Sequence, residues 1–316
     1  ERRSGTPTEK ALLLHAMLGA AKIDSDVVWA PDRDDGRVDL AVANPEWFER
    51  TLVRVELDGQ TLYADPSSQA LAFGRLRPAN EGQQAIVYDR KKPETIELPR
   101  SPLADHRQLA EVDLALDAEG RVSGTGTITL TGHHAAQAMA PGAEEKEVTD
   151  AWSEWLGSRY EGYDVSDVAV KQDPNTQTVE VAFALAQREE EVLGDEATLH
   201  PSRPLGPARQ LFEMPPAQRR TPVLLDFGDV KQVEVTLTWP EGWQVESGPV
   251  AFERATQAGS ALYQVETDPA ERTFKLTRRM EINKELYVNS QEYASLRELF
   301  ELMERQDAKP LVLVRR

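Results

Sequence analysis

Cysteine is absent from this 316-residue chain, which limits the covalent chemistry that the protein can perform. A thiolate is a strong nucleophile and a metal ligand, and two thiols are needed for a disulfide. The sequence therefore excludes thiol catalysis, disulfides and thiolate metal sites within the chain. The hydroxyls of Ser4, Thr6 and Thr8 are the alternative nucleophiles near the N-terminus, and they would need a base beside them.

Clustered aspartates and histidines are the candidates for metal binding. Asp32, Asp34 and Asp35 precede a glycine, but this glycine is one position too early for an EF-hand loop, so we interpret the segment as an acidic turn. His133 and His134 have no Asp, Glu or further His nearby at a usual ligand spacing. We therefore expect no metal site and no cofactor.

Other conspicuous residues fit structural roles. His15 lies inside a predicted helix and is expected in its core. Gly124 and Gly126 alternate within a predicted strand, which favours close backbone packing over a nucleotide-binding loop. The acidic run at 189–191 is typical of a solvated turn.

The N-terminal helix has a clear start. Residues 6–9 have the pattern of a capping box, with Thr6 as N-cap, Pro7 at the first helical position and Glu9 at the third. The helix that follows is apolar nearly all round, so we expect it to be buried at the centre of its domain.

A hairpin follows, with arms at 51–57 and 60–65 joined by Asp58-Gly59. Counting from this two-residue turn pairs Leu57 with Gln60, Val55 with Leu62, Val53 with Ala64 and Leu52 with Asp65. The predicted core face carries Val53, Val55, Leu57, Leu62 and Ala64. The opposite face, which would line a cleft, carries Arg50, Leu52, Arg54, Glu56, Thr61, Tyr63 and Asp65.

The remainder of the chain is predicted to be mostly β-structure with two packed helices. One helix near 144–156 has a stripe of Val148, Trp152 and Trp155, and the last helix carries Tyr293, Leu296, Phe300 and Met303. The fold class is therefore α+β and strand-rich, with an antiparallel β-sandwich-like region after the first domain. We place domains at 1–80, 81–210 and 211–316.

Composition excludes several classes of partner. The net charge of −18 and pI near 4.8 disfavour nucleic acid and anionic lipid. No stretch approaches the roughly 20 apolar residues of a membrane helix. The first five residues do not form a signal peptide, and we interpret the sequence as a fragment of a longer protein.

The first eighty residues resemble the transglutaminase-like, or papain-like, superfamily, in its bacterial type with β-rich extensions. In that family a glycine precedes the catalytic Cys at a helix start, and here the stretch is Gly5-Thr6-Pro7-Thr8-Glu9-Lys10-Ala11. The family's His follows an aromatic residue, and here the stretch is Phe48-Glu49-Arg50. The family's Asp lies in an Asp-Pro step, which corresponds to Asp65-Pro66. Leu98-Pro99, Trp239-Pro240-Glu241-Gly242 and the closing helix and strand resemble its C-terminal extension.

The resemblance implies a degenerate triad in which Pro7 and Arg50 replace the nucleophile and the base, and Asp65 alone is retained. The expected function is then a catalytically inactive protein that binds or scaffolds a protein or peptide, in an extracytoplasmic setting. The expected binding residues are Arg50, Arg54, Tyr63 and Asp65, with Arg50 ion-paired to Asp65. Two alternatives remain open. One is an active acyl-transfer or hydrolytic enzyme that uses a non-Cys nucleophile or residues outside this chain. The other is a structural β-module of a larger surface or periplasmic protein. The oligomeric state is not indicated.

Overall fold

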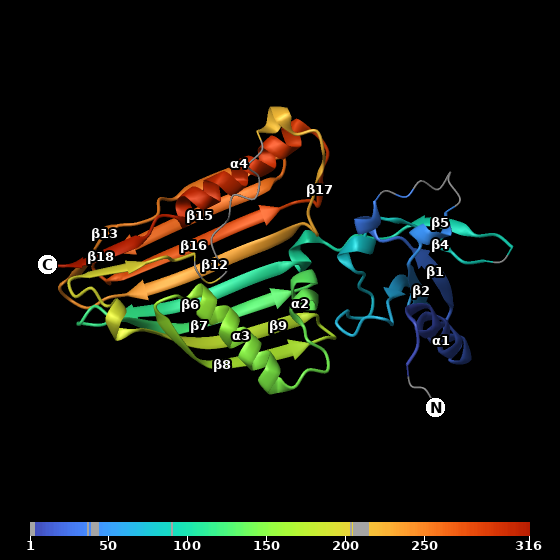
Figure 1. The fold of residues 1–316 in the computed structure, drawn as a ribbon, viewed down its shortest axis with the longest axis horizontal. Helices are drawn as coiled ribbons and strands as arrows, with labels where there is room; N and C mark the ends of the chain where they lie inside the picture. The colour runs from blue at the N-terminus through green and yellow to red at the C-terminus, as the bar shows by residue number, and fades with distance from the viewer. Residues whose placement is uncertain (1–3, 37, 39–43, 90, 203, 205–214) are drawn as a thin grey trace. The chain divides into compact units, whose positions relative to one another are not determined.

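The computed structural model describes residues 4–36, 38, 44–89, 91–202, 204 and 215–316 (Figure 1). The chain divides into unit 1, residues 1–105 with 173–177, and unit 2, residues 106–172 with 178–316. The first division therefore lies at 105/106 and not at 80/81. No division is seen at 210/211, because β6 and β12, from either side of that point, pair within one sheet. The strand-rich α+β class is confirmed.

In the residues that the structure describes, unit 1 is a five-stranded sheet with one α-helix. The strand order is β3-β2-β1-β4-β5, and the pairs are antiparallel. The helix and strands are α1 (Pro7–Ala20), β1 (Ser25–Ala30), β2 (Arg50–Leu57), β3 (Gln60–Ala64), β4 (Gln84–Val87) and β5 (Glu94–Glu97). Short 3-10 helices are η1 (Arg33–Asp35), η2 (Pro45–Trp47), η3 (Pro78–Asn80) and η4 (Leu103–Asp105).

The β2–β3 hairpin has the predicted register, with Leu57 opposite Gln60, Val55 opposite Leu62 and Val53 opposite Ala64. Each face carries a buried core away from the turn, whereas Leu57, which was predicted for the core face, is 39% exposed beside the turn. One core contains Ala11, Val53 and Val55, with Leu14, Leu18 and Ile23 packed against it. The other contains Val28, Ala30, Leu52, Tyr63, Leu76, Ala85, Val87 and Leu98. On the face predicted to line a cleft, Leu52 and Tyr63 therefore belong to a second hydrophobic core, whereas Glu56 and Thr61 near the turn are exposed.

Helix α1 begins as predicted but is not a central buried helix. Thr6 Oγ1 accepts from the Glu9 amide at 3.2 Å, and Glu9 Oε2 accepts from the Thr6 amide at 2.7 Å, which completes the capping box. Only Ala11 is fully buried, whereas Leu13 and Met17 are each about 60% exposed. The prediction of burial was wrong because the sheet covers one side of the helix only.

Unit 2 is built on an eight-stranded sheet of order β14-β15-β16-β12-β6-β7-β9-β8 (Figure 1). β6 and β12 are parallel, and the other recorded pairs of this sheet are antiparallel. Its strands are β6 (Arg107–Leu116), β7 (Val122–Thr131), β8 (Tyr163–Asp173), β9 (Thr178–Gln187), β12 (Asp229–Thr238), β14 (Phe252–Thr256), β15 (Gly259–Asp268) and β16 (Thr273–Ile282).

Smaller elements complete unit 2. A three-stranded sheet contains β10 (Glu196–Leu199), β18 (Leu311–Arg315) and β13 (Trp243–Ser247), and β11 (Val223–Leu224) pairs with β17 (Leu286–Tyr287). The helices are α2 (His133–Ala138), α3 (Glu145–Arg159) and α4 (Ser290–Asp307), with η5 (Glu189–Glu191) and η7 (Pro216–Gln218) as 3-10 turns. No described helix is long and apolar enough to cross a membrane.

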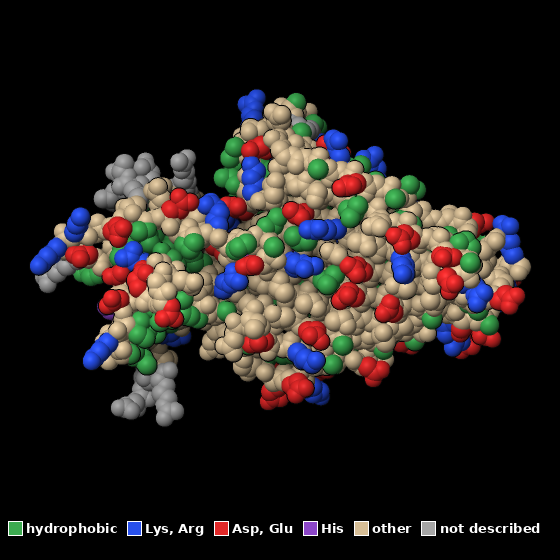
Figure 2. Space-filling view, turned by 180° about the vertical axis from the view of Figure 1, so that it is seen from behind, with side chains coloured by type: hydrophobic (Ala, Val, Ile, Leu, Met, Phe, Trp, Pro, Cys, Tyr) green, Lys and Arg blue, Asp and Glu red, His purple; other side chains and the backbone are tan. Residues whose placement is uncertain are grey.

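Alternation of apolar residues determines which face of the large sheet is covered. In β9, Val179, Val181, Phe183 and Leu185 are buried, as predicted. Gly126 of β7 lies opposite Phe183, and a Cβ at Gly126 would meet the Phe183 ring at 2.4 Å. The predicted close backbone packing is found at Gly124, where a Cβ would overlap the Asp113 carbonyl oxygen, whereas the close neighbour of Gly126 is a side chain. Figure 2 shows the molecule from behind, with Lys, Arg, Asp and Glu scattered over the face turned towards the viewer.

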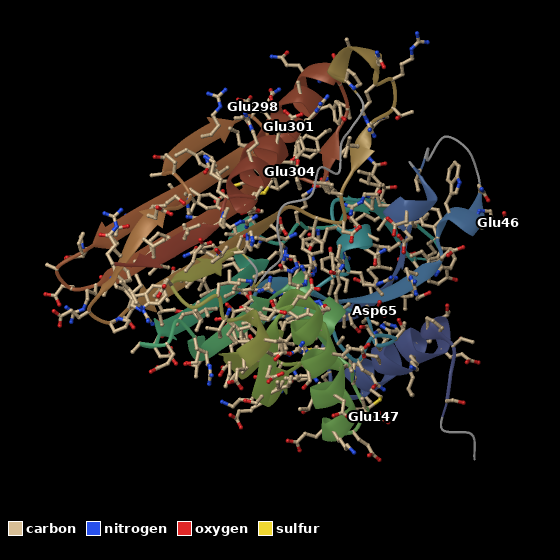
Figure 3. All side chains as sticks on the ribbon, turned by 60° about the vertical axis from the view of Figure 1, so that its left-hand side comes forward. Glu46, Asp65, Glu147, Glu298, Glu301 and Glu304 are labelled. Atoms are coloured by element: carbon tan, nitrogen blue, oxygen red, sulfur yellow. The ribbon has the colours of Figure 1, made fainter. Side chains whose placement is uncertain are left out.

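The two longer helices of unit 2 bury different proportions of their predicted stripes. In α4, Tyr293, Leu296 and Met303 are buried, and its surface carries Glu298, Glu301 and Glu304 (Figure 3). In α3, Val148 and Leu156 are buried. Trp152 and Trp155 are only partly buried and pack edge-to-face on each other with centroids 5.3 Å apart.

Candidate functional site

Polar residues that the sequence singled out lie where strands β1 and β3 end and β2 begins, at one end of these strands in the unit 1 sheet. β1 ends at Ala30, which pairs with Arg50 at the start of β2, and β3 ends at Ala64, directly before Asp65. The first turn of α1 reaches the same end of the strands, because Thr8 Oγ1 lies 2.9 Å from Thr51 Oγ1. Pro7 and Arg50 occupy the positions expected for the nucleophile and the base. They are the chain neighbours of Thr8 and Thr51, whose hydroxyls contact each other.

Among the described residues, the start of α1 carries no nucleophile with a base beside it. Pro7 has neither a reactive side chain nor a backbone N–H. The Thr6 hydroxyl accepts the Glu9 amide in the capping box. In return, the Thr6 amide donates to the Glu9 carboxylate, and this hydrogen bond holds the pKa of the Glu9 carboxyl below its ordinary value. The Thr8 hydroxyl has Thr51 as its partner. His15, the histidine nearest in sequence, has its Nδ1 3.0 Å from the Ser25 hydroxyl.

The predicted ion pair between Arg50 and Asp65 does not form. Arg50 Nε lies 3.9 Å from an oxygen of Asp32 instead. Asp65 Oδ1 accepts hydrogen bonds from the amide and the hydroxyl of Ser67, the amide at 2.9 Å. Asp65 follows the last paired residue of β3, so its short side chain turns to its own backbone two residues on. The register was right, but local hydrogen bonding determined the partner.

Arg50 belongs to a group that we call the Asp32 cluster: Asp32, Arg50, Arg77 and Asn80. Arg77 Nη1 lies 3.5 Å from the same Asp32 oxygen that Arg50 approaches. Asn80 is fully buried, and its side-chain amide donates to the Pro31 carbonyl at 2.8 Å. Asp32 Oδ1 accepts from the Asp34 amide at 3.2 Å and so caps η1, which confirms the acidic turn.

Sequence reasoning missed Arg77 and Asn80. Both lie in the proline-punctuated stretch that we treated as a domain boundary, and no periodic pattern marks them. The single available signal was Pro78 after an arginine, which is typical of a helix start at η3.

Arg54 and Tyr63, the other two predicted binding residues, already have structural roles in unit 1. Arg54 donates to Asp26 Oδ2 at 2.8 and 3.1 Å. Burial alone would lower the pKa of Arg54, but the hydrogen bond and charge of Asp26 raise it. Tyr63 is buried in the second core, and this burial raises the pKa of its phenol. Within the described residues, Arg50 is the predicted binding residue that keeps donors available.

Unit 2 brings together histidines that are far apart in sequence. His106 and His133 stack with ring centroids 3.9 Å apart, and the His133 amide donates to His106 Nδ1. His134 Nε2 lies 2.9 Å from Asp229 Oδ2, and its Nδ1 lies 2.8 Å from the Gln108 amide. The spacing of residues in the sequence did not indicate these partners, because they come from segments far from His133 and His134 along the chain.

Asp229 in this group is ionised at neutral pH. Its burial would raise the pKa of the carboxyl, but the hydrogen bond from His134 and the charge of Lys231 lower it below its ordinary value. The Lys231 ammonium lies 3.4 Å from Asp229 Oδ2. His134 thus has partners at both ring nitrogens, which fits a structural role between β6, α2 and β12.

Comparisons with known proteins show similarity in fold. Residues 203–313 match the model of DUF3858, a domain of unknown function with a solved structure. No curated protein matches the chain. The crystal structure of a putative protease from Parabacteroides distasonis superposes on 98% of this chain with a TM-score of 0.53 and 16% sequence identity. The superposed part is 44% of that protein, so this chain spans less than half its length.

These matches establish resemblance at the level of architecture. The DUF3858 match covers about a third of the chain and lies in unit 2. The similarity to the Parabacteroides protein extends over both units at an identity that indicates a shared fold alone.

Proposed function

We propose that unit 1 is a transglutaminase-like module that has lost its catalytic residues and now binds or scaffolds a protein or peptide. The observation that carries this proposal is the 2.9 Å contact between the hydroxyls of Thr8 and Thr51. It joins the first turn of a helix to the start of a strand, directly beside Pro7 and Arg50. A helix N-terminus next to a strand start suits a nucleophile and a base.

Neither residue at these positions can perform that chemistry. Proline has no nucleophilic atom, and the arginine guanidinium stays protonated at any pH at which the protein works. Asp65 hydrogen-bonds to Ser67 and does not orient a base. The fold similarity to the protein described as a putative protease supports descent from an enzyme-like architecture. An extracytoplasmic setting remains part of the proposal, by resemblance to the bacterial proteins.

Assays of hydroxamate formation from a glutamine peptide and of peptide hydrolysis test the loss of catalysis. The wild type and Pro7→Cys should both be inactive, because Arg50 still cannot accept a proton. The double variant Pro7→Cys/Arg50→His should gain measurable thiol reactivity, whereas Pro7→Cys/Arg54→His, with the imidazole four residues further along β2, should not.

Activity of the wild-type chain that is lost on substituting one of its own residues would contradict the proposal and favour an active enzyme. Absence of both activity and peptide binding would favour a purely structural β-module instead.

A further inference from the structure

We propose that the Asp32 cluster binds a carboxylate group, with Arg50 and Arg77 as the residues that hold it. This inference rests on the proposed function, since it names the chemistry that the binding module would recognise. The observation behind it is that two guanidiniums from different segments converge on one carboxylate oxygen, and neither closes tightly on it.

The two arginines have hydrogen-bond donors to spare. The Arg50 contact of 3.9 Å is beyond hydrogen-bond distance, and the Arg77 contact of 3.5 Å is at its limit. Arg50 Nε is buried and has no acceptor among the described atoms. Each guanidinium carries five N–H donors, and the two side chains are 30% and 34% exposed. A ligand can therefore reach both.

Two other arginines of unit 1, in contrast to Arg50 and Arg77, form close salt bridges with a carboxylate. Arg54 lies 2.8 Å from Asp26, and Arg75 lies 2.5 Å from Asp105. Both are charge-assisted pairs at full contact. Among the described residues, Arg50 has no such close partner, although the protein as a whole carries an excess of acidic residues.

Charge favours a monoanion. Two guanidiniums and one aspartate leave a formal charge of +1, which one carboxylate would neutralise. A planar carboxylate also matches the planar fork of a guanidinium, which can donate two parallel hydrogen bonds to it. A phosphate dianion would exceed the available charge.

The framework around the cluster is fixed before a ligand arrives. Arg50 is paired with Ala30 in the sheet, and Arg77 is the N-cap of η3. The buried Asn80 fastens η3 to the Pro31 carbonyl that follows β1. Asp32 is held by the Asp34 amide and positions the two cations. Little conformational entropy is then lost on binding.

The test is an NMR titration of the arginine Nε–Hε signals of the full chain with sodium acetate, at constant pH and with chloride replaced to keep ionic strength constant. We expect saturable shifts at Arg50 and Arg77. Arg50→Gln should raise the Kd for acetate, measured from the Arg77 signal, by at least about tenfold, because it removes one of the two guanidinium groups. Arg54→Gln is the matched control, because Arg54 lies on the same strand and is closed by Asp26.

Several outcomes would overturn the carboxylate site. They are non-saturable shifts with acetate, saturation by inorganic phosphate but not by acetate, or equal loss of binding in the Arg54→Gln control. Arg50→Lys gives a second variant that keeps the charge and should still weaken acetate binding. The acetate titration and the catalytic assays test different statements. If the chain is catalytically active and binds acetate, only the proposed function is contradicted. If the chain is inactive and does not bind acetate, only this inference is contradicted.

Discussion

At the scale of single residues, the start of α1 shows how a short motif determines local structure. Thr6 and Glu9 satisfy each other's backbone amides, and Pro7 needs no partner because it has no N–H. The Thr8 hydroxyl has a different task, since its partner Thr51 belongs to the sheet.

These roles predict an order of stability. Thr6→Ala should lower the free energy of unfolding by about 1 kcal/mol, because an N-terminal amide loses its acceptor. Thr8→Ala should cost less, because water can replace one hydroxyl–hydroxyl contact at the partly exposed surface. Urea unfolding of both variants at neutral pH measures the difference. The opposite order would show that Thr8, and not Thr6, holds the helix start.

At the scale of elements, β7 and β9 can lie side by side with Phe183 inward only because Gly126 has no side chain. Gly126→Ala should destabilise the protein by about 1–3 kcal/mol through overpacking, since the Phe183 ring atoms would lie within 2.9 Å of the new Cβ. Gly157→Ala is the control. It lies in α3 with no neighbour within 4 Å, so alanine should be neutral or stabilising. Thermal or urea melts compare the two, and a harmless Gly126→Ala would mean that the ring moves aside easily.

A buried ion pair fastens α4 to the sheet. Arg278 of β16 donates to both oxygens of Asp307 at 2.8 and 2.9 Å, and the Tyr263 hydroxyl also donates to Asp307. The Arg278 and Asp307 side chains are 3% and 0% exposed. Burial would lower the pKa of Arg278, but the Asp307 carboxylate raises it, so the guanidinium stays charged.

Asp307→Asn should therefore cost about 3–5 kcal/mol, because a buried guanidinium loses its counter-charge. The double variant Arg278→Met/Asp307→Leu should recover part of this loss. The exposed pair between Arg254 and Glu298 also links α4 to the sheet, and Arg254→Ala should cost no more than about 1 kcal/mol. Equal losses for the two pairs in urea unfolding would contradict the importance given to burial.

At the scale of the whole molecule, the net charge of −18 acts against compactness. Like charges repel more strongly in the folded chain than in the unfolded one, and salt screens this repulsion. We expect the melting temperature to rise between 20 and 200 mM sodium chloride at pH 7. A fall over this range would mean that surface ion pairs, such as Arg188 with Asp164, outweigh the net repulsion.

Local patterns in the sequence were sufficient for the capping box of α1, the β2–β3 register and the close backbone packing at Gly124. Each depends on neighbours a few residues apart or on the strict alternation of a strand. The absence of thiol chemistry followed from composition alone, because no arrangement of the chain can supply an absent cysteine.

Only the tertiary structure decided which faces are covered and which charged groups meet. Leu13 and Met17 look like core residues, yet they are exposed because one layer of sheet covers α1. Arg50 lies near Asp32 and Arg77, and His133 stacks on His106, through segments that no local pattern relates. Such contacts depend on where separate elements pack, and on competition between a distant partner and a near one, as Asp65 shows by bonding to Ser67.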